Sequence, residues 1–150
     1  MAHYAELGVD NIVKRVLYID TVKCMTNGGI EKEEIGREYL ETQHGGTWIK
    51  CSFNTYGNVH NEGGTPFRAN YPGEGDYYNS TNDIFHAPRP TDMNGQSCIS
   101  WTLNTTTGLW TPPITKPIHE NDPSVSEVPQ YYYWDESVYQ ADNSKGWVLV

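Results

Sequence analysis

The segment from Asn54 to Tyr78, which reads NTYGNVHNEGGTPFRANYPGEGDYY, constrains the fold more than any other part of the chain. Glycine adopts backbone conformations that other residues avoid, and aromatic side chains supply large, rigid areas for burial. The stretch from 54 to 94 shows little helical or strand periodicity, and irregular stretches of this length are usually functional or disordered. Because disordered chains are poor in aromatic residues, we predict an ordered loop with a defined shape.

The composition bounds the size and the partners of the protein. A chain of 150 residues suits a single domain over residues 1–150. Hydrophobic residues make up 37% and aromatic residues 13%, with eleven tyrosines and five tryptophans, so amphipathic rings replace aliphatic bulk. The formal net charge of -9 argues against a nucleic-acid partner, which would require a basic surface.

The three cysteines, Cys24, Cys51 and Cys98, form no CxxC pair. This spacing does not support a zinc site, and an odd number of cysteines does not support a closed disulfide framework. We predict reduced, buried thiols, which fit synthesis in a cytoplasm. No apolar run resembles a signal peptide or reaches transmembrane length, so we predict no membrane partner.

The order of apolar residues predicts a mainly β protein with one α-helix near 31–43 and long ordered loops. His3–Leu7 and Ile12–Ile19 flank a turn and are rich in β-branched and aromatic residues, which predicts an N-terminal β-hairpin. Ile30–Gln43 carries apolar residues on one helical face, and Thr47–Phe53 alternates as a strand does. Because hairpins lie at both ends of the chain, we expect them to form a small sandwich or barrel-like core.

Paired tryptophans mark the strands expected in the second half of the chain. Cys98–Leu103 and Leu109–Thr111 predict a hairpin in which Trp101 and Trp110 meet across the strands. Residues 114–129 are rich in proline and predict an extended crossing. A second hairpin with Trp134 and Trp147 is expected to follow, built from Gln130–Trp134, Ser137–Gln140 and Gly146–Val150.

Four consecutive aromatic residues, from Tyr131 to Trp134, form the densest aromatic run. In a strand, Tyr131 and Tyr133 face one side, while Tyr132 and Trp134 face the other. One of the two faces is expected to be exposed unless a partner covers it, and large exposed aromatic patches mark interfaces. Stacking on sugar rings is the alternative use of such a face.

No residue pattern supports catalysis, a cofactor or a metal. His60 has no carboxylate or cysteine partner at a recognised spacing, so we predict a hydrogen-bonded structural histidine. His119, Glu120 and Asp122 lie together in the proline-rich stretch, where a solvated loop is the better interpretation than a metal site. No nucleophile elbow, zinc-protease or phosphate-loop motif is present. We therefore predict a protein that is not an enzyme and has no small-molecule ligand.

Three stretches together resemble a family of small virion structural proteins of tailed phages, especially phages of marine bacteria and cyanobacteria. They are the opening MAHYAELGVDNIVKRVLYID, the central CSFNTYGNVHNEGGTPFRANYPGEGDYY and the late SWTLNTTTGLWTPP. The family's opening resembles MAHFAxLDxxNxVxxVxxV, and Gly8 stands where an aspartate is frequent. Matching positions are Met1, Ala2, His3, Ala5, Leu7, Asn11, Val13, Asn54, Thr55, Gly57, Val59, His60, Gly64, Arg68, Asn70, Tyr71, Gly75 and Tyr78.

The resemblance implies a particle component without catalysis, located in the virion. We expect a capsid decoration protein that binds the major capsid protein or other virion proteins, with self-association also open. A neck or tail adaptor, a fibre component and a carbohydrate-binding module for host glycans are the alternatives. Arg68 is expected either to bind a partner's carboxylate or carbonyl groups or to clamp its own glycine loop. The interface candidates are Tyr4, Tyr56, His60, Arg68, Tyr71, Tyr132 and Trp134.

Overall fold

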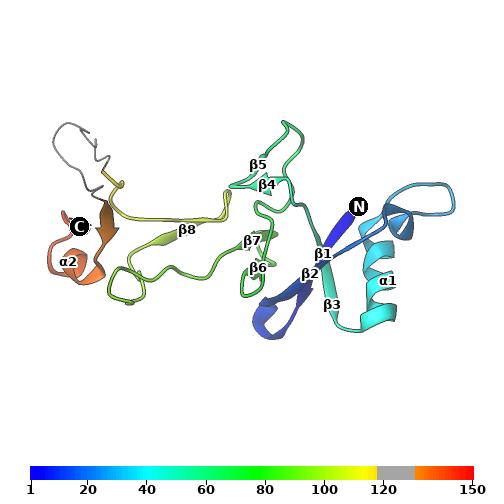
Figure 1. Cartoon of the computed structure of the whole chain (residues 1–150), viewed down its shortest axis with the longest axis horizontal. Coiled ribbons are helices and arrows are strands. Elements are labelled where there is room, and N and C mark those ends of the chain that lie inside the picture. Colours follow the sequence, from blue (N-terminus) through cyan, green and yellow to red (C-terminus); the bar gives the residue numbers. More distant parts are fainter. Residues whose placement is uncertain (118–130) are drawn as a thin grey trace. The chain divides into compact units, whose positions relative to one another are not determined.

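The computed structural model describes residues 1–117 and 131–150, and these residues form two compact units (Figure 1). The first comprises Met1–Pro88 and Asn104–Leu109. The second comprises Arg89–Leu103 and the described part of Trp110–Val150. Whether the two behave as the single domain expected for 1–150 stays a prediction. Most of the predicted proline-rich crossing, together with His119, Glu120 and Asp122, lies outside the described residues.

A three-stranded antiparallel sheet organises the first unit, with the strand order β2-β1-β3. The strands are β1 (Ala2–Leu7), β2 (Val13–Ile19) and β3 (Thr47–Cys51). β1 pairs with β2 so that Tyr4 lies opposite Leu17, which confirms the predicted N-terminal hairpin. The register of this pair shifts between Glu6 and Leu7, because Lys14 of β2 has no partner residue in β1.

The predicted helix is α1 (Glu33–His44), and it covers one face of this sheet. Glu33 and Glu34 lie in its first turn, where negative charge is favourable. Gly45 ends the helix with a φ of 69°, a conformation that glycine adopts without strain, and its N–H donates to the Glu41 carbonyl. Two 3-10 turns complete this half of the unit, η1 (Val9–Asn11) and η2 (Thr21–Cys24).

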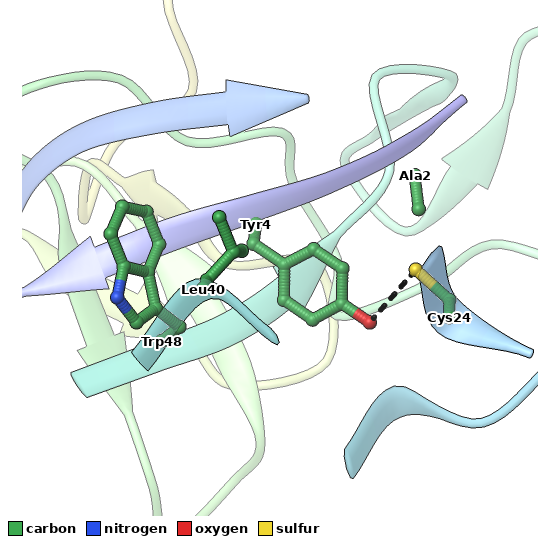
Figure 2. Packing of buried hydrophobic residues seen from close by; sticks show 5 residues of the cluster. All are labelled: Ala2, Tyr4, Cys24, Leu40 and Trp48. Carbon is green, nitrogen blue, oxygen red and sulfur yellow. Dashed lines mark hydrogen bonds between the residues drawn. The ribbon is translucent and has the colours of Figure 1, made fainter. Parts of the chain in front are cut away.

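Strand β1 is buried because both faces of the sheet carry a hydrophobic cluster. On the helical face, Tyr4 is fully buried with Leu40 and Trp48 (Figure 2). On the opposite face, Ala5 packs with Phe85, which is also fully buried. The side chains of β1 therefore alternate between two cores rather than between a core and solvent.

The long segment predicted to be an ordered loop contains two short antiparallel hairpins. In one, Thr55 lies opposite His60, and in the other, Tyr78 lies opposite Phe85. The second hairpin thus carries Phe85, which packs against Ala5 on the face of the sheet opposite α1. The four strands are β4 (Thr55–Tyr56), β5 (Val59–His60), β6 (Tyr77–Asn79) and β7 (Ile84–His86).

The remaining elements are β8 (Thr102–Asn104) paired with β9 (Leu109–Thr111), and β10 (Tyr132–Trp134) paired with β11 (Trp147–Leu149). In the second pair, Trp134 lies opposite Trp147, as the paired-tryptophan pattern predicted. Side chains along β10 alternate as expected: Tyr131 and Tyr133 are exposed, and Trp134 is buried. The mainly β fold class is confirmed. The described sheets are small and open, so the expected sandwich or barrel-like core was too specific.

Two strand predictions in the second unit were wrong. Ser137–Gln140 lies in the short helix α2 (Glu136–Ala141), because the Asp135 carboxylate accepts hydrogen bonds from the N–H groups of Ser137 and Val138. The strand expected from Cys98 begins only at Thr102. The carbonyls of Cys98 and Trp101 instead accept hydrogen bonds from the Arg89 guanidinium, which holds this stretch as a turn.

The buried Gly36 of α1 provides a test of the helix–sheet contact. Alanine normally stabilises a helix relative to glycine, but a Cβ at this position would overlap the Tyr4 hydroxyl and come within 2.7 Å of the Cys24 sulfur. We expect Gly36→Ala to lower the free energy of unfolding by about 1–3 kcal/mol in urea denaturation. The exposed helical control Glu38→Ala should change it by less than about 0.5 kcal/mol. A stabilised Gly36→Ala protein would contradict this packing.

Candidate functional site

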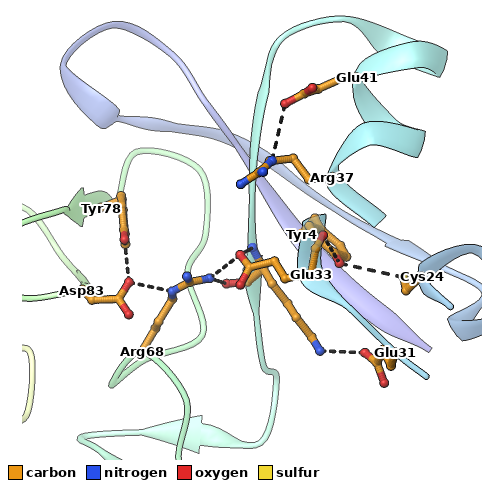
Figure 3. A network of polar contacts seen from close by, with 10 residues as sticks. Tyr4, Cys24, Glu31, Glu33, Arg37, Glu41, Arg68, Tyr78 and Asp83 are labelled. Carbon is orange, nitrogen blue, oxygen red and sulfur yellow. Dashed lines mark hydrogen bonds and ion pairs between the residues drawn. The ribbon is translucent and has the colours of Figure 1, made fainter. Parts of the chain in front are cut away.

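The side chain of Arg68 lies at the centre of a polar network that joins three segments of the first unit (Figure 3). Its Nη1 donates to Glu33 Oε1 at 2.7 Å and to the Lys50 carbonyl at 2.8 Å, and its Nε donates to Asp83 Oδ1 at 2.7 Å. The guanidinium also lies 4.7 Å from the centre of the Phe67 ring. With a side chain only 13% exposed, Arg68 is the internal clamp of the glycine loop.

The backbone around this arginine is held in an unusual conformation. Arg68 and Ala69 have φ values of 50° and 63°, in the left-handed region that costs free energy for residues other than glycine. The next residue, Asn70, stabilises the turn: its Oδ1 accepts from the Gly57 N–H at 2.8 Å, and its Nδ2 donates to the Phe85 carbonyl at 2.9 Å. Asn70 was not among the interface candidates, and its role is structural.

The pKa values of Arg68 and Asp83 are shifted in the directions that keep both groups charged. Burial works against the charge of Arg68, but the hydrogen bonds to Glu33 and Asp83 outweigh it and raise the arginine pKa. Burial likewise opposes ionisation of Asp83, yet hydrogen bonds from Tyr78 and Arg68 hold the carboxyl pKa below its usual value. Burial, followed by the bond to Asp83, raises the pKa of Tyr78 to about 12, so the phenol stays a donor.

The remaining candidates differ in whether their side chains can reach a partner. His60 is hydrogen-bonded, as predicted: its Nδ1 accepts from the Glu62 N–H at 3.1 Å. The residue is partly exposed, and its role as an interface contact stays a prediction. Tyr4 and Trp134 are 0% and 4% exposed, so these two proposed contacts were wrong, because both rings fill cores. Tyr56 is 67% exposed. Tyr132 is partly buried at the start of β10.

Tyr71 belongs to a surface that the sequence interpretation missed. We call it the aromatic surface and define it as Met1, His3, Tyr18, Phe53 and Tyr71. The His3 ring lies 5.1 Å from the Phe53 ring, 5.7 Å from Tyr71 and 6.0 Å from Tyr18, measured between ring centres. Every member except His3 is more than a third exposed, and a shallow hollow of about 390 Å³ lies among Met1, His3, Tyr18 and Phe53.

No side chain of the aromatic surface is charged at neutral pH, and the N-terminal ammonium group of Met1 is the charge beside it. Burial, followed by repulsion from the N-terminal ammonium group, lowers the pKa of His3 below its ordinary value, so the imidazole is neutral. The sequence did contain a signal for part of this surface, because His3 and Tyr18 lie opposite each other in the predicted hairpin. Phe53 and Tyr71 join them only through tertiary packing.

The described residues contain neither a metal-binding cluster nor a helix that could cross a membrane. In residues 1–117 and 131–150, no three His, Cys, Asp or Glu side chains are grouped so that they could hold a metal ion. The helices of the described ranges are too short or too polar to span a bilayer.

Comparison of the chain with family models, curated proteins and solved structures finds no match. The resemblance to the virion family therefore stays a prediction.

The clamp predicts that replacing Arg68 destabilises the protein much more than replacing Arg37, another arginine of the same unit. Arg68→Ala should lower the free energy of unfolding by about 2–4 kcal/mol, because it removes the cation paired with Glu33 and the donor to the Lys50 carbonyl. Arg37→Ala is the control: Arg37 is an exposed helical residue, 3.8 Å from Glu41, and its loss should cost less than about 0.5 kcal/mol. Equal losses in urea denaturation would show that Arg68 is no clamp.

The lowered pKa of Asp83 predicts a stability change in acid. A carboxyl whose pKa is lower in the folded chain stabilises that state fully above its unfolded pKa, and this contribution is lost as pH falls through the folded value. We expect unfolding free energy to fall below about pH 4, and Asp83→Asn to make this fall shallower. Tyr78→Phe should act in the same direction because it removes one stabilising donor. Parallel pH profiles for all three proteins would contradict the assignment.

Proposed function

We propose that this chain is a non-enzymatic structural protein of a tailed-phage particle, most specifically a decoration protein that binds the outside of the assembled head. The observation that carries the proposal is the aromatic surface of the first unit, which is exposed and has no charged side chain. Large exposed aromatic patches mark protein interfaces, and Tyr and Phe are enriched there. The partner would be the major capsid protein or another virion protein.

The Arg68 clamp supports this role because it joins three segments of the unit before binding. Phe67 and Tyr78 pack against the Arg68 guanidinium, and Tyr71 lies one residue beyond the buried Asn70. A surface that is ordered before binding loses little conformational entropy on association. The acidic net charge of -9 would keep the free protein soluble and steer it toward a basic partner surface.

The position and copy number of the protein on a purified particle test the proposal. Cryo-electron microscopy of particles with a tagged copy should place it on the head, with on the order of hundreds of copies, as a symmetric shell lattice requires. About a dozen copies or fewer at one vertex or along the tail would favour the neck, tail or fibre alternative instead. Absence of the protein from purified particles would overturn both.

Binding to undecorated heads tests the surface itself. Phe53→Ala should weaken binding about tenfold or more, as loss of a central aromatic anchor does. Val22→Ala is the matched control, since Val22 is similarly exposed but lies outside the aromatic surface. Sedimentation with heads and densitometry of the bound fraction give the readout, and unchanged melting temperatures exclude misfolding. Equal binding by the two variants would remove the aromatic surface from the interface.

A further inference from the structure

The second unit has an aromatic pocket of about 350 Å³ that the proposed function does not use. The indoles of Trp101, Trp134 and Trp147 meet there, with ring centres 5.2–6.0 Å apart. Tyr131 and Tyr133 also line the pocket and are each about half exposed. All of these residues belong to one compact unit, so the pocket is a property of that unit alone.

The three indole N–H groups of the pocket differ in their hydrogen bonding. Trp134 Nε1 donates to Glu136 Oε2 at 2.7 Å, and Trp147 Nε1 donates to the Ile114 carbonyl at 2.8 Å. Trp101 Nε1 is buried and has no hydrogen-bond partner in the described part of the chain. A buried donor without an acceptor destabilises the free protein, and a ligand that supplies an acceptor relieves this cost.

Three acceptor groups around the pocket are, by contrast, already engaged. The Asp92 carboxylate takes the N–H groups of Asn94, Gln96 and Glu136 at 2.8–2.9 Å. The carbonyls of Pro90 and Trp134 accept from the N–H groups of Cys98 and Met93. Lys116 also lines the pocket and adds a donor, so a ligand that suits these groups presents apolar rings together with hydrogen-bond acceptors.

We propose that this pocket binds an extended, proline-rich segment of a partner protein. Proline has no backbone N–H, its ring is apolar, and its polyproline II conformation presents carbonyl acceptors outward. Aromatic grooves recognise such segments in several protein classes. A sugar fits less well, because each hydroxyl brings a donor and the Asp92 carboxylate already accepts three N–H groups.

Binding requires a local side-chain movement. The Trp101 nitrogen is shielded from solvent in the free chain, so a peptide carbonyl reaches it only after the pocket opens. The half-exposed tyrosines Tyr131 and Tyr133 stand among its lining residues and would contact the proline rings. The inference does not rest on the virion role, because the aromatic surface lies in the other unit.

Fluorescence anisotropy with the full chain and a labelled oligoproline peptide tests the proposal. We expect saturable binding by the wild-type protein and none of the same peptide with alanine at every proline. Trp101→Phe keeps the ring and removes the N–H, so it should weaken binding about tenfold. Trp110→Phe is the matched control outside the pocket lining and should bind as the wild type does. Tyr133→Ala, at an exposed position, should weaken binding without loss of melting temperature.

Several outcomes would overturn the proposal. They are no binding of oligoproline by the wild-type protein, or equal binding by Trp101→Phe and Trp110→Phe. Binding to a glycan array that is lost in Tyr133→Ala, without binding of oligoproline, would replace the peptide by a carbohydrate. A dimer in light scattering that Tyr133→Ala dissociates would identify a second copy of the chain as the occupant.

Discussion

The ion pairs of Arg68 are the interaction on which the first unit depends. One guanidinium joins the start of α1 through Glu33, the edge strand β3 through the Lys50 carbonyl, and the loop at Asp83 (Figure 3). The backbone at Arg68 and Ala69 is left-handed, a conformation that persists only when surrounding contacts impose it. The clamp supplies those contacts, so the loop's unusual shape and the packing of the sheet stabilise each other.

The same arrangement explains why a segment rich in glycine is ordered. Asn70 accepts from the Gly57 N–H and donates to the Phe85 carbonyl, so it links the β4–β5 hairpin to β7. The segment then delivers Phe85 to one face of the sheet, while Leu40 of α1 fills the other. Outside this framework, aromatic side chains remain exposed at one end of the sheet and around one pocket of the second unit.

Local patterns predicted the elements whose stability is local. The hairpin of β1 and β2, the helix α1 and the tryptophan pair of β10 and β11 follow from alternation, helical spacing and turn residues. Ser137–Gln140 was mistaken for a strand because the pattern of apolar residues gave no weight to the cap at Asp135. The sequence could not decide between the two roles of Arg68, because its partner Glu33 lies 35 residues away. The burial of Tyr4 was missed because α1, which covers it, is not part of the hairpin pattern.

The burial of β1 on both faces has a consequence for the order of folding. The β1–β2 hairpin is local and can form within microseconds. It stays half-formed until β3, α1 and Phe85 arrive, and these lie between about thirty and eighty residues further along the chain. Until the last of them docks, Tyr4 and Ala5 have no cover on one side or the other. β1 is therefore synthesised first but is fully packed last. Its apolar side chains can aggregate until the rest of the unit has been synthesised and has folded onto it.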